Sequence, residues 1–205
     1  MKKTSIAIFM ALLLAGCAGA PDQSTPTPPT GMQTDARRMV ISFDYQSQSG
    51  HASNQFAVWI EDADGNLVKT LYATAFTANG GYKRRPDSIL NWVRQSGLAA
   101  LSKAEVDAVT GATPKSGNLS YVWDLTDGAG GAAPEGAYTF VVEGTMRWKN
   151  YVLYSGAIAI GGESAMITAE PFYHFEADGG NAALTEDSAE TDMITNVTAA
   201  YIPAK

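Results

Sequence analysis

The stretch that decides the fold is Phe56-Ala57-Val58-Trp59-Ile60-Glu61-Asp62-Ala63-Asp64-Gly65-Asn66, with Leu67–Thr77 after it. The runs Phe56–Glu61 and Leu67–Thr77 are rich in β-branched and aromatic residues, and the loop between them is short, polar and contains glycine. A loop of this kind between two strand-forming runs is typical of a β-hairpin. We therefore expect two antiparallel strands over these residues.

Similar runs recur along the chain from residue 39 onward. Because about eight such runs are separated by Gly-rich turns, the pattern predicts a mainly β fold, an antiparallel immunoglobulin-like β-sandwich over residues 39–205. The other expected strands are Met39–Tyr45, Ser120–Leu125, Tyr138–Trp148, Val152–Ile160, Pro171–Glu176 and Met193–Ile202.

One turn of the expected sandwich carries a recognisable pattern. The segment Tyr121-Val122-Trp123-Asp124 precedes a turn with Gly128, Gly131 and Pro134, and Gly136-Ala137-Tyr138-Thr139-Phe140 follows it. This pattern resembles the immunoglobulin-like module of flagellar hook-capping proteins, in which a Trp-Asp strand end and a Gly-x-Tyr strand start flank a turn. The resemblance implies a fold and no chemistry.

The pattern changes between residues 80 and 117. Pro86-Asp87-Ser88 opens a helix-like run that includes Trp92 and closes near Gly97. Ser102-Lys103-Ala104-Glu105 matches a capping box at the start of a second short helix. We expect a helical and loop insertion over residues 80–117, and long insertions of this kind are often functional.

Composition limits the classes of function. The chain has 205 residues, a single Cys, two His and a formal charge of −7. One Cys excludes an internal disulfide and multi-cysteine metal sites, and the two distant His residues do not suggest a metal centre, so no metal site is predicted. The acidic balance argues against a nucleic-acid partner.

The first residues have the pattern of an export signal. Lys2 and Lys3 precede a short apolar run at Ile6–Leu14, which is too short to span a bilayer. The sequence Leu14-Ala15-Gly16-Cys17 resembles the bacterial lipobox. The resemblance implies that residues 1–16 are removed and that Cys17 is lipidated, with Ala18 after it favouring the outer membrane. An ordinary secretory signal with an incidental Cys is the alternative.

Residues 17–38 are rich in Pro and Thr and contain almost no large apolar side chain. Such a segment buries too little surface to offset its ordering entropy, so we expect a disordered tether between the lipidated Cys and the sandwich.

One motif points to specific chemistry. The sequence Asp107-Ala108-Val109-Thr110-Gly111-Ala112-Thr113 resembles the flavinylation motif Asp-x-x-Ser/Thr-Gly-Ala-Ser/Thr of proteins modified by FAD:protein FMN transferase. The resemblance implies that FMN from FAD is attached covalently, as a phosphoester, to Thr113. It also implies that Asp107, Thr110, Gly111 and Ala112 are recognition positions.

The residue types suit that modification. A phosphoester needs a hydroxyl, and an isolated hydroxyl needs a base, usually with a metal, from another protein. The small Gly111 and Ala112 allow close approach of the transferase, and Pro114 prevents a helix from resuming. The alternative is a Gly-Ala turn with an unmodified Thr113. Residues 114–116 and the sandwich fold differ from the FMN-binding subunits of sodium-pumping NADH:quinone reductase, so no particular redox partner is implied.

A wider set of segments is similar to an uncharacterised periplasmic family of the domain-of-unknown-function type. The segments are Phe56–Asp62, Gly80–Asp87, Asp107–Thr113 and Tyr121–Asp124, and the resemblance covers about residues 39–165. That family is often associated with flavin-transferase and membrane redox genes.

Lys83, Arg84 and Arg85 form the compact basic cluster of the expected domain. They could pair with the flavin phosphate or with an acidic transferase surface, or they could simply lie in a solvated turn. Tyr82 or Trp92 could stack on the isoalloxazine ring. Trp92 fits better as a core residue on an apolar helix face.

We therefore expect a membrane-anchored, covalently flavinylated electron-transfer protein of the bacterial envelope. Its expected partners are the FMN transferase, membrane or periplasmic redox proteins, and the bilayer through the lipid on Cys17. No catalytic residue is predicted, so a carrier is favoured over an independent enzyme. The alternative is an immunoglobulin-like binding or assembly lipoprotein without a cofactor.

Overall fold

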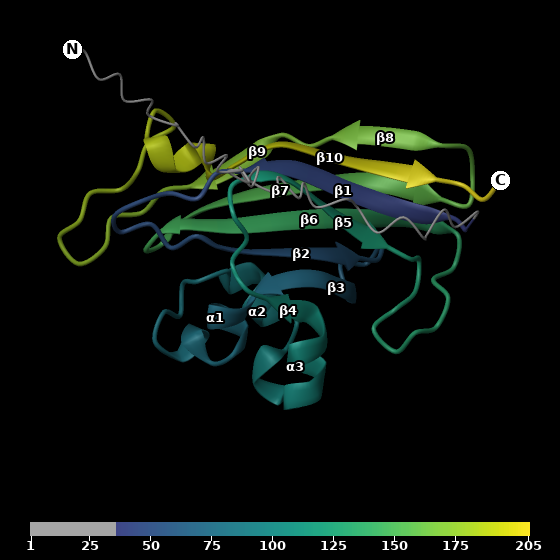
Figure 1. The fold of residues 1–205 in the computed structure, drawn as a ribbon, viewed down its shortest axis with the longest axis horizontal. Coiled ribbons are helices and arrows are strands. Elements are labelled where there is room, and N and C mark those ends of the chain that lie inside the picture. Colours follow the sequence, from purple (N-terminus) through teal and green to yellow (C-terminus); the bar gives the residue numbers. More distant parts are fainter. Residues whose placement is uncertain (1–35) are drawn as a thin grey trace, which may run out of the picture. The chain divides into compact units, whose positions relative to one another are not determined.

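A computed structural model describes residues 36–205, which form two β-sheets and a group of short helices (Figure 1). The predicted signal peptide, Cys17 and almost all of the tether lie outside the described residues. The four-stranded sheet has the order β5-β1-β10-β8, and the six-stranded sheet has the order β4-β3-β2-β6-β7-β9. The strands are β1 (Arg38–Tyr45), β2 (Gln55–Glu61), β3 (Leu67–Thr74), β4 (Thr110–Gly111), β5 (Gly117–Trp123), β6 (Gly136–Arg147), β7 (Asn150–Ile160), β8 (Ala165–Thr168), β9 (Pro171–His174) and β10 (Ile194–Ile202). The helices are α1 (Ala75–Ala78), α2 (Leu90–Gln95) and α3 (Lys103–Val109), with 3-10 turns η1 (Gly81–Lys83), η2 (Leu98–Ala100) and η3 (Ala189–Met193).

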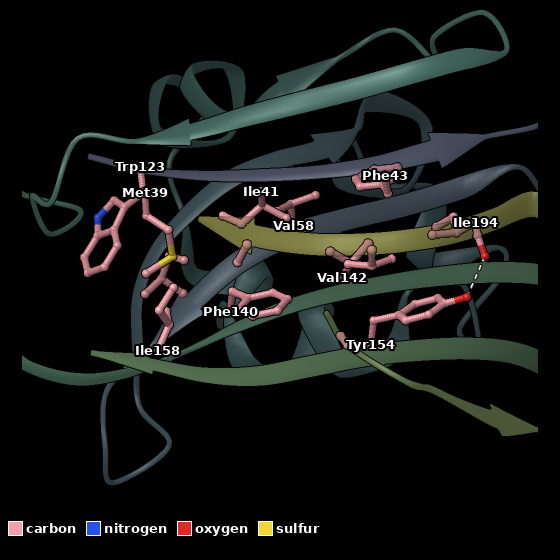
Figure 2. Close-up of a cluster of buried hydrophobic side chains, with 14 of the residues drawn as sticks. Met39, Ile41, Phe43, Val58, Trp123, Phe140, Val142, Tyr154, Ile158 and Ile194 are labelled. Atoms are coloured by element: carbon pink, nitrogen blue, oxygen red, sulfur yellow. Dashed lines mark hydrogen bonds between the residues drawn. The ribbon is translucent and has the colours of Figure 1, made fainter. Parts of the chain in front are cut away.

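The main core fills the space between the two sheets (Figure 2). Strand β1 alternates strictly, so that Met39, Ile41 and Phe43 are fully buried while the residues between them are partly exposed. Each such large apolar side chain stabilises the fold by about 1.5–3 kcal/mol on burial. Tyr154 of β7 crosses the core and donates a hydrogen bond from its hydroxyl to the carbonyl of Ile194, 2.7 Å away.

The strand order is that of an immunoglobulin-like sandwich. Strands β1, β2, β3, β5, β6 and β7 have the neighbours of strands B, C, C′, E, F and G of that fold. The last strand, β10, pairs antiparallel with β1 and occupies the position of strand A. The predicted fold class is thereby confirmed, with the added finding that β10 lies between β1 and the edge strand β8.

A tyrosine corner supports the same assignment. Tyr138, near the start of β6, donates from its hydroxyl to the carbonyl of Pro134 at 2.8 Å, which is the hydrogen bond that marks the E–F corner of such domains. The ring of Trp123 packs edge-on against Tyr138 with centroids 4.9 Å apart. These are residues of the two segments that flank the predicted turn. The resemblance to the hook-capping module itself stays a prediction.

The helices cover the outer face of the six-stranded sheet, next to β3 and β4 (Figure 1). A second cluster of buried residues lies under them, contributed by Trp59 of β2, Val141 of β6, Trp92 of α2 and Val106 of α3. Strand β2 is therefore buried on both faces. Trp92 is 0% exposed and donates from Nε1 to Thr70 Oγ1 at 3.0 Å, so its predicted core position is confirmed.

Polar side chains of β6 hold this helical layer to the sheet. Glu143 is fully buried and its carboxylate accepts hydrogen bonds from the backbone and side-chain N–H groups of Asn91, at 3.1 and 2.9 Å, and from the backbone of Trp92, at 2.9 Å. Two residues along β6, Thr145 Oγ1 accepts from the Ile89 backbone at 2.7 Å. Ile89 has a positive φ of 41°, and these bonds keep it in that strained conformation.

Burial of Glu143 predicts an unusual pH dependence. Desolvation raises the pKa of this carboxyl from 4.5 to about 7, against the opposing effects of its hydrogen bonds and of Arg94. Because the folded state then holds a proton that the unfolded state releases, this group's contribution to stability falls as pH rises from about 4.5 to 7, by up to about 3 kcal/mol. Denaturant unfolding from pH 4.5 to 8 measures the free energy of unfolding of wild type and of Glu143→Gln. As pH rises, wild type should lose stability relative to the Gln variant. Parallel pH curves would contradict this.

The structure corrects some expected strands. The strand expected over Leu67–Thr77 ends at Thr74, because Thr74 Oγ1 takes over the pairing with the backbone of Phe56 and the chain turns into α1. The strand expected at Ser120–Leu125 runs from Gly117 to Trp123. The short strands β4 and β8 were not expected.

Candidate functional site

The motif Asp107–Thr113 begins on the last turn of α3. The predicted capping box is present, since Ser102 Oγ accepts from the Glu105 backbone and the Glu105 carboxylate accepts from the Ser102 backbone. Val106 is buried in the second cluster, between the helices and the six-stranded sheet, which we call the outer core. It packs α3 against β3. Asp107, the next residue, is exposed and forms an ion pair with Lys103, one turn earlier.

The next two residues form an edge strand. Thr110 and Gly111 make up β4, which pairs parallel with Ala73 and Thr74 at the end of β3. Gly111 lies against the ring of Tyr72, so closely that a Cβ at Gly111 would stand 2.8 Å from Tyr72 Cε2. The Tyr72 hydroxyl then donates to the carbonyl of Ala112 at 2.7 Å. The glycine therefore lets Tyr72 bind the backbone of the motif.

Thr113 lies on the segment that crosses from β4 in one sheet to β5 in the other. This segment is held at one end by Tyr72 and at the other by Ser116, whose hydroxyl accepts from the Ser47 backbone at 2.9 Å. Thr113 is exposed between these two anchors, and its hydroxyl makes no hydrogen bond to any other residue within 36–205. A protruding hydroxyl on a segment with fixed ends can be reached by another protein's active site.

Tyr72 belongs to an aromatic group under the motif. Its ring lies 4.9 Å from that of Tyr121 on β5 and 5.2 Å from that of Phe56 on β2, measured between centroids. Burial raises the pKa of both Tyr72 and Tyr121, so both hydroxyls stay neutral donors at physiological pH. Sequence reasoning did not single out Tyr72, because its partner Ala112 is 40 positions away.

The predicted basic cluster lies next to the motif through α1. Helix α1 contacts both β4 and η1, and Lys83, Arg84 and Arg85 are exposed at and after the end of η1. Within residues 36–205 none of these three side chains forms an ion pair. Tyr82 is half-buried and packs against the outer core, with Lys83 over its ring at 5.7 Å.

Phe76 of α1 is a second residue that sequence reasoning missed. Its side chain is 43% exposed, and the Arg85 guanidinium lies over its ring at 5.4 Å. The expected strand over Leu67–Thr77 would have made Phe76 an ordinary strand residue. The early end of β3 places it on a helix between the motif and the cations instead.

Comparison with known proteins identifies the family to which the chain belongs. The model of the family described as "Predicted periplasmic protein (DUF2271)" matches residues 37–174 of the chain. The chain belongs to the DUF2271 family. No curated protein and no solved structure matches it. The DUF2271 match spans β1 to β9 and so contains the whole motif, the basic cluster and Phe76.

Membership in DUF2271 confirms the resemblance to an uncharacterised periplasmic family and supports a location in the periplasm or cell envelope. Among residues 36–205, no helix is long and apolar enough to cross a bilayer. Strand β10 lies beyond the matched residues, although it pairs with β1 in the middle of the smaller sheet.

The contact between Gly111 and Tyr72 gives a prediction. A methyl group at Gly111 has to displace the Tyr72 ring and break its bond to Ala112, which should destabilise the protein by about 1–3 kcal/mol. Tyr72→Phe keeps the ring and loses only the hydrogen bond, with an expected effect of about 1 kcal/mol. Denaturant unfolding of Gly111→Ala and Tyr72→Phe measures both. An Ala variant as stable as wild type would show that Tyr72 does not hold the motif.

Proposed function

We propose that this protein is an envelope lipoprotein that carries FMN as a phosphoester on Thr113 and serves as an electron carrier outside the cytoplasm. The observation that supports this most is the exposed Thr113 hydroxyl, which stands within the motif on a segment held at both ends. The periplasmic family is consistent with a modification made outside the cytoplasm.

The residues fit the group. An ester bond needs a hydroxyl that a transferase can reach, and Thr113 is exposed. Close approach of a transferase to Thr113 needs small neighbouring residues, and Gly111 and Ala112 are small. The Tyr72 ring occupies the space on one side of Gly111. An anionic phosphate near the attachment point suits unpaired cations, and Arg84 and Arg85 lie beyond α1.

The attachment balances as a phosphoryl transfer from FAD. The Thr113 oxygen forms a bond to the phosphorus on the FMN side of the FAD pyrophosphate, the bond from that phosphorus to the bridging oxygen breaks, and AMP leaves. The hydroxyl proton passes to a base of the transferase, because no residue of this chain within 36–205 accepts a hydrogen bond from Thr113. Nothing is oxidised or reduced in this step.

Once bound, FMN supplies redox chemistry, accepting electrons in pairs and releasing them singly. The chain's own residues attach and orient it: α3 and β4 present Thr113, and Tyr72 fixes the backbone beside it. The lipid on Cys17 and the tether over residues 17–38 would keep this carrier at a membrane, where it could meet redox proteins.

The mass of the mature protein tests this function. Wild-type protein made together with the transferase and FAD should gain the mass of FMN minus water, and its yellow colour should survive denaturation and desalting. No mass gain, under conditions that modify an established acceptor, would contradict the proposal and favour a cofactor-free immunoglobulin-like binding lipoprotein.

A further inference from the structure

Helix α1 brings the attachment point and the basic cluster to one region of the surface. Strand β4 pairs Gly111 with Thr74, the residue that precedes α1, and runs parallel to β3. The motif therefore leaves the sheet beside the first residues of α1. Helix α1 also contacts η1, which leads directly into Arg84 and Arg85.

A shallow hollow lies over this region. It has a volume of about 290 Å³ and is lined by Phe76, Asn79, Gly80, Gly81 and Arg84. We call these residues together with Arg85 the Phe76 face. It presents an aromatic ring that is 43% exposed, flanked by two guanidinium groups. Planar aromatic ligands stack on exposed rings of this kind, and guanidinium groups stack on or pair with such ligands as well.

The backbone fixes the ring of Phe76 in place. Gly81 packs so tightly on Phe76 that a Cβ at Gly81 would lie 2.2 Å from the Phe76 carbonyl oxygen and 2.7 Å from ring atom Cε1. Gly80 has a φ of 94°, which other residues rarely adopt. The two glycines thus let the turn after α1 close against Phe76, so that the backbone holds the ring while the Arg85 guanidinium lies over it.

The charge of this face is complementary to a flavin. In an acidic protein, Arg84 and Arg85 form no ion pair within residues 36–205, although Asp87 and Asp178 line a neighbouring hollow with them. A flavin attached through its phosphate carries negative charge there, and its isoalloxazine ring gains negative charge on reduction. Nearby guanidinium groups stabilise both.

We propose that the Phe76 face is the docking surface for the isoalloxazine ring of the flavin carried on Thr113, with Phe76 stacked on the ring and Arg84 and Arg85 stabilising its reduced, anionic form. This inference rests on the proposed attachment at Thr113. It assigns a binding role to residues outside the motif and makes the flavin a docked group, whose potential the protein sets.

The test uses flavinylated full-length protein and two pairs of variants. Phe76→Ala is compared with Phe172→Ala, an equally simple loss of an exposed ring (60% exposed) on β9, the opposite edge strand of the same sheet. Arg85→Gln is compared with Lys149→Gln, which removes a cation that is paired with Glu176. Intact mass first shows whether each protein carries the adduct, and flavin anisotropy, iodide quenching and midpoint potential follow.

We expect the wild-type flavin to be less mobile and less accessible to iodide than the same flavin on a proteolytic peptide. Loss of the Phe76 ring should lower the ratio of docked to free flavin about fivefold, which corresponds to about 1 kcal/mol, with Phe172→Ala unchanged. Arg85→Gln should move the potential to a more negative value, and Lys149→Gln should leave it in place.

The outcomes separate the two proposals. A wild-type protein without the adduct overturns the attachment at Thr113 and the docking surface with it. A protein that carries the adduct, but whose flavin is as mobile as on the peptide or is unaffected by Phe76→Ala, overturns the docking surface alone.

Discussion

Replacing Thr113 with alanine is expected to reduce covalent flavin from stoichiometric to undetectable. The attachment needs a hydroxyl oxygen as nucleophile, and alanine has none. Thr113 is exposed and forms no hydrogen bond within the described residues, so its loss should leave the fold and stability within about 0.5 kcal/mol of wild type. Flavin fluorescence in a denaturing gel, together with intact mass, measures the effect.

Two further variants serve as controls for Thr113→Ala. Thr113→Ser keeps the hydroxyl and should be modified, because the motif accepts either residue at that position. Ser116→Ala removes another exposed hydroxyl three residues later and should also be modified, although its bond from Ser47 is lost. Covalent flavin on the Thr113→Ala variant would show that another residue is the attachment point and would contradict the proposal.

Replacing Glu143 with alanine is expected to destabilise the protein by about 3 kcal/mol, because one buried and two partly buried N–H donors lose their acceptor and a cavity forms. The donors belong to Asn91 and Trp92, so the helical layer should detach first. Denaturant unfolding measures the total effect. Faster trypsin cleavage after Lys83, Arg84 and Arg94 would locate it in this layer.

Glu143→Gln is the matched control. Its amide oxygen can still accept from Asn91, while its NH₂ group faces the backbone N–H of Trp92, so we expect an intermediate loss of stability at pH 5. An alanine variant as stable as the glutamine variant would contradict the role of Glu143 as the anchor of the helices.

The sandwich could be predicted because its signals are local. Strand β1 alternates buried and partly exposed residues, and Asn66 and Asp62 close the hairpin between β2 and β3 with short-range hydrogen bonds. The reason for the continuous apolar run Phe56–Ile60 within β2 could not be predicted in the same way. Its outer face is covered by α2 and α3, which lie far along the chain and are held by Glu143.

The candidate site likewise has parts that could be predicted from the sequence and parts that could not. The motif and the basic cluster are each continuous in sequence and could be recognised there. Tyr72 and Phe76 could not, because their importance comes from pairing between β3 and β4 and from the end of β3 at Thr74. The contribution of such residues depends on long-range register, which a single sequence does not show.

The measurement that tests the attachment most directly is fragmentation of one tryptic peptide. Cleavage after Lys103 and Lys115 gives the peptide Ala104–Lys115, whose hydroxyl side chains are those of Thr110 and Thr113. Tandem mass spectrometry of this peptide, from protein made with the transferase and FAD, should place FMN on Thr113. Flavin on Thr110, or an unmodified peptide from a protein that carries flavin elsewhere, would contradict the account.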